Sequence, residues 1–109
     1  MPIILVDFDL SHADQRLYQS VRAEFVDELR RGRRQDQIHF VGNRCFISTP
    51  ETIYEFVHRL IKRNVFTLDQ DRIVIVDESS RKMCVFGGCD MQIFEAFESY
   101  ELIDISEYL

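Results

Sequence analysis

The apolar residues of this 109-residue chain alternate between two spacings, and this alternation constrains the fold more than any other feature. Residues 53–61 (IYEFVHRLI) place apolar side chains three or four positions apart, which is the spacing of one helix face. A second helical stripe begins at Leu17 and runs to about Arg30, just before Gly32. Residues 3–8 (IILVDF) instead form a short β-rich run that predicts a buried strand. The chain is therefore expected to contain both helices and strands.

Further short apolar segments predict additional strands. Residues 37–41 (QIHFV) and 45–48 (CFIS) are expected to form a hairpin, because Gly42-Asn43 between them suits a tight turn of the primed type. Residues 71–76 (DRIVIV) and 82–86 (KMCVF) have the composition of two more strands. These segments lie before and after the stripe at 53–61 in the sequence.

The expected helix starts and a terminal strand set the order of elements. Ser11 and Thr49-Pro50 are the predicted starts of the two helices, since Ser and Thr cap helices and Pro suits the first turn. Residues 102–105 (LIDI) predict a terminal strand. The order predicts an α+β protein with a ferredoxin-like βαββαβ sandwich, in which an antiparallel sheet carries two helices on one face, plus a C-terminal strand or tail. The other face, with Ile3 and Leu5, is expected to be apolar and covered by a partner or by the tail.

Charge is distributed unevenly along the chain. All 13 Lys and Arg residues lie within residues 1–82, whereas the segment after Cys89 holds six acids and no base. The remaining 13 acids balance the 13 bases, so residues 1–89 are formally neutral although the whole chain has a net charge of −6. We therefore expect one domain over residues 1–89 and an acidic, aromatic extension over residues 90–109 that packs on its own sheet or on a partner's. A neutral domain can carry a basic patch.

Composition also excludes several classes of protein. No apolar run approaches the ~20 residues that a membrane span needs, and the apolar stretch at residues 3–6 is too short for a signal peptide. The odd number of cysteines, three, is more typical of reduced thiols than of a disulfide framework. We expect a cytoplasmic protein with no membrane partner.

The region around the first strand and helix resembles a known family. The segment VDFDLSHADQR contains an aromatic-Asp-aliphatic step at Phe8-Asp9-Leu10, and Arg16 follows in the helix. A looser match continues through GNRCFIST, ETIYEFVHRLIKR and DRIVIVDE, so that the similarity covers roughly residues 3–78. Together these motifs resemble the CRISPR-associated protein 2 group and its VapD-like relatives. The resemblance implies a homodimer whose protomers meet through their sheets, with a C-terminal strand that adds to the partner's sheet through Leu102, Ile103 and Ile105.

The same resemblance implies a function in nucleic-acid handling. The group includes metal-dependent ribonucleases and deoxyribonucleases, and also architectural subunits that only hold nucleic acid. Its nuclease members hold a divalent ion between the strand-end aspartates of two protomers, so Asp9 is the expected catalytic and metal-binding residue, with Mg²⁺ or Mn²⁺ as the ion. The residues expected to contact RNA or DNA phosphates are Arg16, Arg30, Arg31, Arg33 and Arg34.

The residue pattern alone leaves other interpretations open. Asp9 has the position of an acid that caps the following helix, and the RRGRR segment has that of a solvated helix end. Asp7 shares the strand face of Asp9 and is a weaker metal candidate. Cys84 and Cys89 lack the spacing and number of zinc ligands and fit small buried hydrophobes better. The candidates for a general acid or base are the three histidines, His12, His39 and His58.

The uneven charge distribution also supports a different class of function. A non-catalytic protein-interaction module, such as an immunity-type, antitoxin-like or regulatory subunit, would use the acidic extension to bind a basic protein partner. The six acids there are interleaved with the aromatic residues Phe94, Phe97, Tyr100 and Tyr108. The structural alternative is that the extension only folds back over the sheet.

Overall fold

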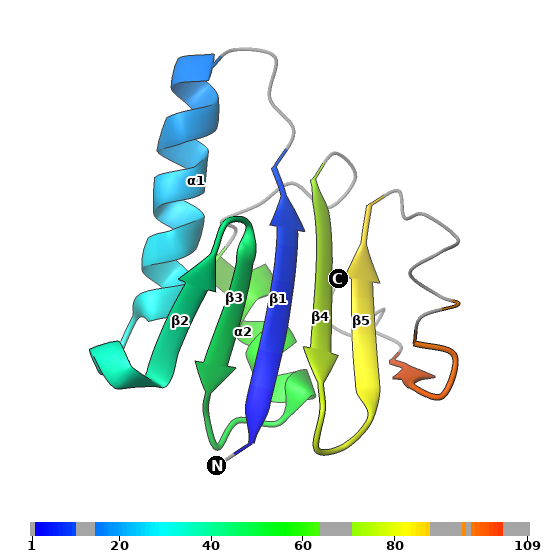
Figure 1. Cartoon of the computed structure of the whole chain (residues 1–109). Coiled ribbons are helices and arrows are strands. Elements are labelled where there is room, and N and C mark those ends of the chain that lie inside the picture. Colours follow the sequence, from blue (N-terminus) through cyan, green and yellow to red (C-terminus); the bar gives the residue numbers. More distant parts are fainter. Residues whose placement is uncertain (1, 11–14, 64–70, 88–94, 96, 104–109) are drawn as a thin grey trace.

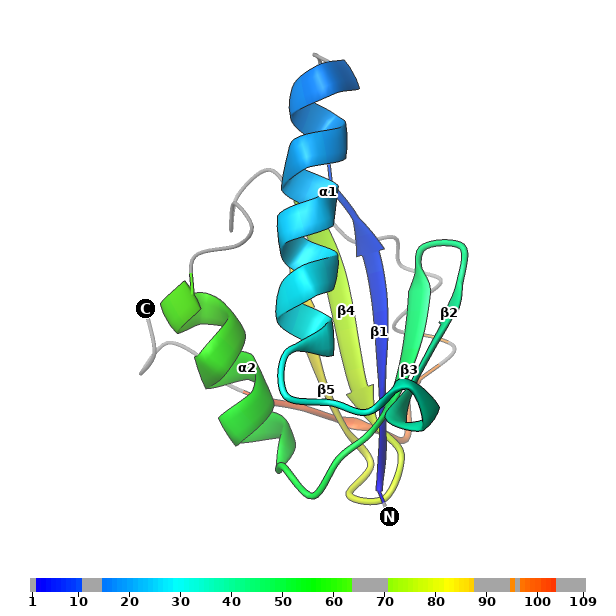
Figure 2. The same ribbon diagram turned by 90° about the vertical axis from the view of Figure 1, so that its left-hand side faces the viewer.

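The computed structural model describes residues 2–10, 15–63, 71–87, 95 and 97–103. Within these residues, six strands form one sheet and two helices cover one of its faces (Figures 1 and 2). The strands are β1 (Ile3–Asp9), β2 (Ile38–Val41), β3 (Arg44–Ser48), β4 (Arg72–Asp77), β5 (Lys82–Phe86) and β6 (Glu101–Leu102). The helices are α1 (Gln15–Arg30) and α2 (Ile53–Arg63), and a 3₁₀ turn, η1 (Gln35–Gln37), precedes β2. The predicted α+β class is confirmed.

The strands lie in the order β2-β3-β1-β4-β5-β6. Every neighbouring pair is antiparallel except β5 and β6, which are parallel, so the sheet is mixed but mostly antiparallel. β1 is central: its residue Leu5 lies opposite Phe46 of β3 and opposite Val76 of β4. Because side chains alternate along a strand, this register aligns Phe46, Leu5 and Val76 on one face of the sheet.

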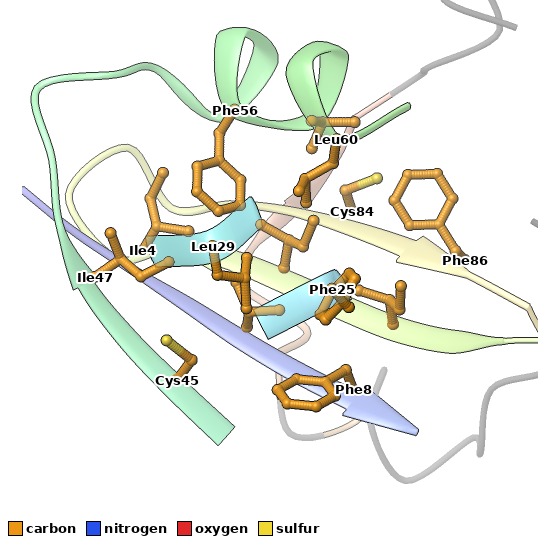
Figure 3. Packing of buried hydrophobic residues seen from close by; sticks show 14 of the residues in the cluster. Ile4, Phe8, Phe25, Leu29, Cys45, Ile47, Phe56, Leu60, Cys84 and Phe86 are labelled. Atoms are coloured by element: carbon orange, nitrogen blue, oxygen red, sulfur yellow. The ribbon is translucent and has the colours of Figure 1, made fainter. Parts of the chain in front are cut away.

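The core lies between the sheet and the helices. Ile4, Val6 and Phe8 of β1 are almost completely buried on that face, as the alternation in the sequence predicts. Helix α1 contributes Phe25 and Leu29, and the Phe8 and Phe25 rings pack with centroids 5.0 Å apart. Figure 3 shows these side chains meeting others from α2, β3 and β5, chiefly Phe56, Leu60, Cys45, Cys84 and Phe86. Burial of these aromatic and aliphatic groups is the main stabilising term of the fold.

Helix α2 begins later than the sequence analysis predicts. The prediction of a start at Thr49-Pro50 is wrong, because the helix starts at Ile53 and Thr52 caps it. The Glu55 amide donates a hydrogen bond to Thr52 Oγ1, and the Thr52 amide donates to Glu55 Oε1, both at 3.2 Å. This reciprocal pair is a capping box.

The two predicted glycine turns are present. Gly32 follows α1 with a φ of 72°, the left-handed conformation that ends many helices. Gly42 joins β2 and β3 with a φ of 59°, as the first central residue of a type II′ hairpin turn requires. The predicted helix start at Ser11 lies outside the described residues.

Part of the C-terminal extension packs on the chain's own sheet. Phe97 and Tyr100 lie against the second apolar cluster, Val74, Val76 and Met83, on the face away from the helices. The Ile103 amide donates a hydrogen bond of 2.9 Å to the Met83 carbonyl oxygen. The extension therefore covers the β4–β5 half of this face.

Neither helix in the described ranges is long and apolar enough to cross a membrane.

Candidate functional site

The sheet face away from the helices is covered unevenly. Over β4 and β5, Val74 and Val76 are at most 5% exposed. Over β1, β2 and β3, in contrast, Ile3 is 46% exposed, Phe46 41% and Val41 55%. We call this uncovered surface, formed by Ile3, Leu5, Val41 and Phe46, the open face. An apolar surface of this kind on a small protein is typical of an interface.

Asp9 lies at the end of β1 on the same side of the sheet as the open face. It is exposed, and its register partner on β4 is Arg72. Asp7, two residues earlier on the same face, forms a 3.5 Å ion pair with Arg44 of β3. Asp7 is therefore already paired, whereas no ion pair of Asp9 occurs within the described residues.

One protomer does not supply a complete set of metal ligands in the part of the chain that is described. No group of three or more His, Cys, Asp and Glu side chains converges there. An exposed strand-end carboxylate nevertheless has the hard oxygen atoms that Mg²⁺ and Mn²⁺ prefer, and Mg²⁺ commonly takes only one or two protein carboxylates with water and phosphate oxygens. Asp9 supplies one exposed carboxylate of this kind in each protomer.

The RRGRR segment is not a uniform basic patch. Arg30, Arg31 and Arg34 are exposed, and the Arg30 guanidinium lies 4.9 Å from the Phe40 ring centroid. The Arg33 side chain is only 7% exposed: its Nε donates to the Leu29 carbonyl oxygen and its Nη2 to Glu51 Oε1, each at 2.8 Å. Arg33 thus joins α1 to the segment before α2, and little of it faces solvent. The side chain of Arg16 lies outside the described part.

A hollow of about 660 Å³ lies beside this segment at the edge of the sheet. Among the described residues, it is lined by Arg30, Arg33, Gln35, Ile38, His39 and Phe40. A guanidinium stacked on an aromatic ring at such an edge combines charge for phosphates with a surface on which a base can stack.

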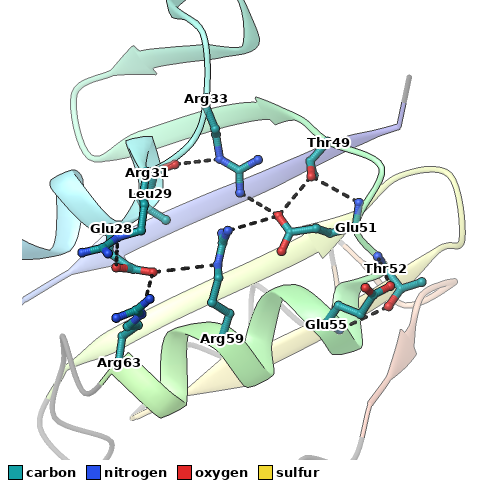
Figure 4. Close-up of polar contacts among 10 residues, drawn as sticks. All are labelled: Glu28, Leu29, Arg31, Arg33, Thr49, Glu51, Thr52, Glu55, Arg59 and Arg63. Atoms are coloured by element: carbon teal, nitrogen blue, oxygen red, sulfur yellow. Dashed lines mark hydrogen bonds and ion pairs between the residues drawn. The ribbon is translucent and has the colours of Figure 1, made fainter.

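A second arginine cluster, not predicted from the sequence, joins the two helices (Figure 4). At its centre is Glu28 of α1, which is only 2% exposed. Its Oε2 pairs with Arg31 at 3.1 Å, while its Oε1 lies 3.9 Å from Arg59 Nε and 3.8 Å from Arg63 Nε. Glu51 pairs with Arg33 at 2.8 Å and with Arg59 at 3.5 Å. The sequence gives one local indication of this cluster. Glu28 and Arg31 are three residues apart, and Arg59 and Arg63 are four apart, which are the spacings of neighbouring side chains on a helix.

Burial changes the titration of two cysteines and one arginine. It raises the pKa of the Cys84 thiol to about 12, and that of Cys45 to about 12 although Arg33 and Arg30 lower it. Both thiols are inert small hydrophobes, as the sequence analysis favours for Cys84. Burial also lowers the pKa of the Arg59 guanidinium, with Arg33 and Arg63 acting in the same direction and Glu51 and Glu28 opposing them.

The remaining candidate residues are dispersed. Leu102 is 55% exposed at the β6 edge, whereas Ile103 is 6% exposed and belongs to the chain's own core cluster. His39 is exposed on β2 and His58 on α2, on different elements from Asp9. Ile105, His12 and Cys89 lie outside the described residues.

Comparisons with family models, curated proteins and solved structures find no match to this chain.

Proposed function

We propose that this chain forms a homodimer through its open face and that the dimer binds RNA or DNA, with phosphodiester cleavage dependent on Asp9 and a divalent ion. The observation that carries the proposal is the exposure of three apolar side chains, Ile3, Val41 and Phe46, each more than 40% exposed on the sheet face away from the helices. The Asp7–Arg44 ion pair and His39 lie on the same face. A second copy of the same face would bury the three apolar side chains symmetrically, as a two-fold interface requires.

The proposal includes a finer fold assignment. The order β2-β3-β1-β4, antiparallel at each step and with α1 and α2 on one face, is consistent with a ferredoxin-like split pair of βαβ units. In this assignment β5 and β6 extend the sheet beyond β4. The fold alone hosts many functions, so it supports the dimer geometry rather than the chemistry.

Three observations support nucleic acid as the ligand. Arg30, Arg31 and Arg34 are exposed at the end of α1 and just after it. Arg31 pairs with Glu28 and Arg34 with Asp36, so Arg30 supplies the positive charge that has no ion-pair partner within the described residues. Arg30 also lies over the Phe40 ring at the hollow, an arrangement that suits a phosphate and a neighbouring base. The resemblance of the Phe8-Asp9-Leu10 step to the CRISPR-associated protein 2 group favours the same ligand.

The proposed role of Asp9 is to hold Mg²⁺ or Mn²⁺ together with Asp9 of a second copy. When bound, such an ion supplies charge neutralisation at the phosphate and an activated water. The chain itself contributes the exposed carboxylate at the end of the central strand β1, and Arg72 in register with it on β4. Arg72 is placed to attract the phosphate backbone towards this edge.

The test is cleavage of RNA and DNA by the wild-type chain and by Asp9→Asn in the presence of Mg²⁺ or Mn²⁺. We expect Asp9→Asn to remove metal-dependent cleavage while the dimer and nucleic-acid binding persist. Asp27→Asn, an equivalent change at an exposed position of α1, is the matched control and should cleave normally. Undiminished cleavage by Asp9→Asn would exclude Asp9 from the reaction.

A second candidate function is a protein-interaction module, and one observation favours it. Glu95, Glu98 and Glu101 are exposed, whereas the aromatic residues Phe97 and Tyr100 pack on the sheet. This leaves an acidic ridge that could attract a basic partner. The test changes these three glutamates to glutamine, which removes their charge and keeps the packing of the extension. Loss of a co-purifying basic protein in this variant would favour the interaction module. Intact nucleic-acid binding would favour the first function.

A further inference from the structure

A second basic surface lies at the end of α2, on the helix side of the molecule. A hollow of about 390 Å³ there is lined, among the described residues, only by the cationic side chains of Arg59, Lys62 and Arg63. Its volume lies within the ~300–1,000 Å³ typical of pockets for small ligands. It is separate from the hollow beside β2, which shares none of these residues.

The cluster around this hollow contains more positive than negative charge. Within the described residues, Arg31, Arg33, Arg59 and Arg63 share two carboxylates, those of Glu28 and Glu51. Lys62 adds another positive charge and has no ion-pair partner within the described ranges. An excess of cations held this close together is stabilised by a bound anion.

The contacts inside the cluster are also incomplete. The Glu28–Arg59 and Glu28–Arg63 separations of 3.9 and 3.8 Å exceed the length of a hydrogen bond. Glu28 Oε1 and the Nε and Nη2 atoms of Arg59 are buried without a hydrogen-bond partner in the described structure. The Arg59 and Arg63 guanidinium groups therefore make no hydrogen bond to the central carboxylate. Because Nε and Nη2 of Arg59 are buried, the exposed cations of the hollow are Lys62 and Arg63, and an oxyanion is the group that arginine binds best.

We propose that Arg59, Lys62 and Arg63 form a phosphate-binding site at the end of α2. This inference rests on the proposed function, because it takes the backbone phosphate of a bound nucleic-acid strand as the ligand. A free polyphosphate would present the same phosphate groups to the site. In a dimer joined through the open faces, the helix layers lie outermost, so this site stays accessible in both copies (Figure 2).

The test compares Lys62→Glu with Lys82→Glu, the same charge reversal at the chain's other lysine, whose Nζ lies over the Tyr54 ring on the opposite end of α2. Binding of a short fluorescent single-stranded oligonucleotide is measured by anisotropy at several salt concentrations. We expect Lys62→Glu to reduce the slope of log affinity against log salt by at least about 0.7, the contribution of one phosphate contact on a single strand. Lys82→Glu should keep the wild-type slope, and Arg63→Gln serves as a second variant of the site.

Tripolyphosphate, added without oligonucleotide, separates the two sources of phosphate. If it raises the melting temperature of the wild type more than that of Lys62→Glu while no oligonucleotide binds, the site stands and the proposed nucleic-acid function fails. If the wild type, Lys62→Glu and Arg63→Gln all bind the oligonucleotide with one slope, the site is refuted and the proposed function stands. Failure of the wild type to bind either probe would refute both.

Discussion

Phe46 of β3 lies directly opposite Leu5 of β1, at the centre of the open face. On the other side of Leu5 the same row continues to Val76 of β4, which is 1% exposed because the C-terminal extension covers that half. Phe46, in contrast, is 41% exposed. One row of side chains therefore passes from a covered half of the sheet to an uncovered half, and Phe46 marks the uncovered half.

Phe46→Glu should dissociate the proposed homodimer without unfolding the protomer. A charge at the centre of an apolar interface must be desolvated when the two faces meet, whereas in the monomer the position is already accessible to water. Sedimentation should show a shift from dimer to monomer, with an unchanged circular dichroism spectrum. Ala23→Glu adds the same charge at an exposed position of α1 and should leave the dimer intact.

Glu28→Gln should destabilise the fold much more than the loss of a surface ion pair. Glu28 is buried between arginines of both helices, so its replacement leaves their charges without a counter-ion. We expect a loss of about 2–3 kcal/mol, below the ~3–5 of a fully buried pair because Arg31 and Arg63 are more than half exposed. Asp36→Asn, which removes the exposed Arg34–Asp36 pair, should cost less than about 1 kcal/mol in the same urea titration. Equal losses would show that the cluster does not stabilise the fold.

Gly87→Ala should be more harmful than Gly32→Ala. Both glycines have a positive φ, 75° and 72°, so each substitution carries the penalty of about 1–2 kcal/mol for a left-handed residue. A Cβ at Gly87 would also overlap the Asp71 carbonyl oxygen, whereas a Cβ at Gly32 meets no atom within 4 Å. Thermal unfolding should show a further loss of ~1–3 kcal/mol at Gly87. A smaller loss at Gly87 than at Gly32 would contradict the close approach to β4.

The two buried thiols should stay unreactive in the native protein at mildly alkaline pH. Their pKa of about 12 exceeds the ~8.5 of a free thiol. The folded state therefore keeps the full benefit of its neutral thiols below about pH 8.5, and this contribution to the free energy of unfolding is lost as the pH rises towards 12. At pH 9, iodoacetamide should modify Cys45 and Cys84 only after unfolding, as measured by mass spectrometry of their peptides. Rapid modification of Cys84 in the folded protein would show that β5 is not buried as described.

The features that depend on local sequence could be predicted. The alternation in residues 3–8 places Ile4, Val6 and Phe8 on the buried face, and residues 82–86 correspond to β5 without a change of boundary. The start of α2 could not be predicted, because two threonines three residues apart, Thr49 and Thr52, can both cap a helix. Only the reciprocal bonds between Thr52 and Glu55 distinguish them.

The features that depend on contacts between distant segments could not be predicted. Arg33 belongs to the most basic segment of the sequence, yet its side chain is directed to Glu51, eighteen residues away. Glu28 has the appearance of an ordinary surface acid in α1, and its burial follows only from the position of α2. Ile103, which the resemblance assigns to a dimer contact, is 6% exposed within the chain's own core cluster. Periodicity assigns a residue to a face of its element and does not identify the element that packs there.

The proposed dimer predicts a short distance between its two Asp9 positions in solution, and cross-linking measures this distance. In Asp9→Cys, treated with a short bis-maleimide, we predict a covalent dimer on a denaturing gel, whereas Ala23→Cys on the helix layer and the wild-type chain should remain monomeric under the same conditions. A monomer in all three samples, or equal cross-linking through Ala23→Cys, would contradict a dimer that joins its sheets and brings the two strand-end aspartates together.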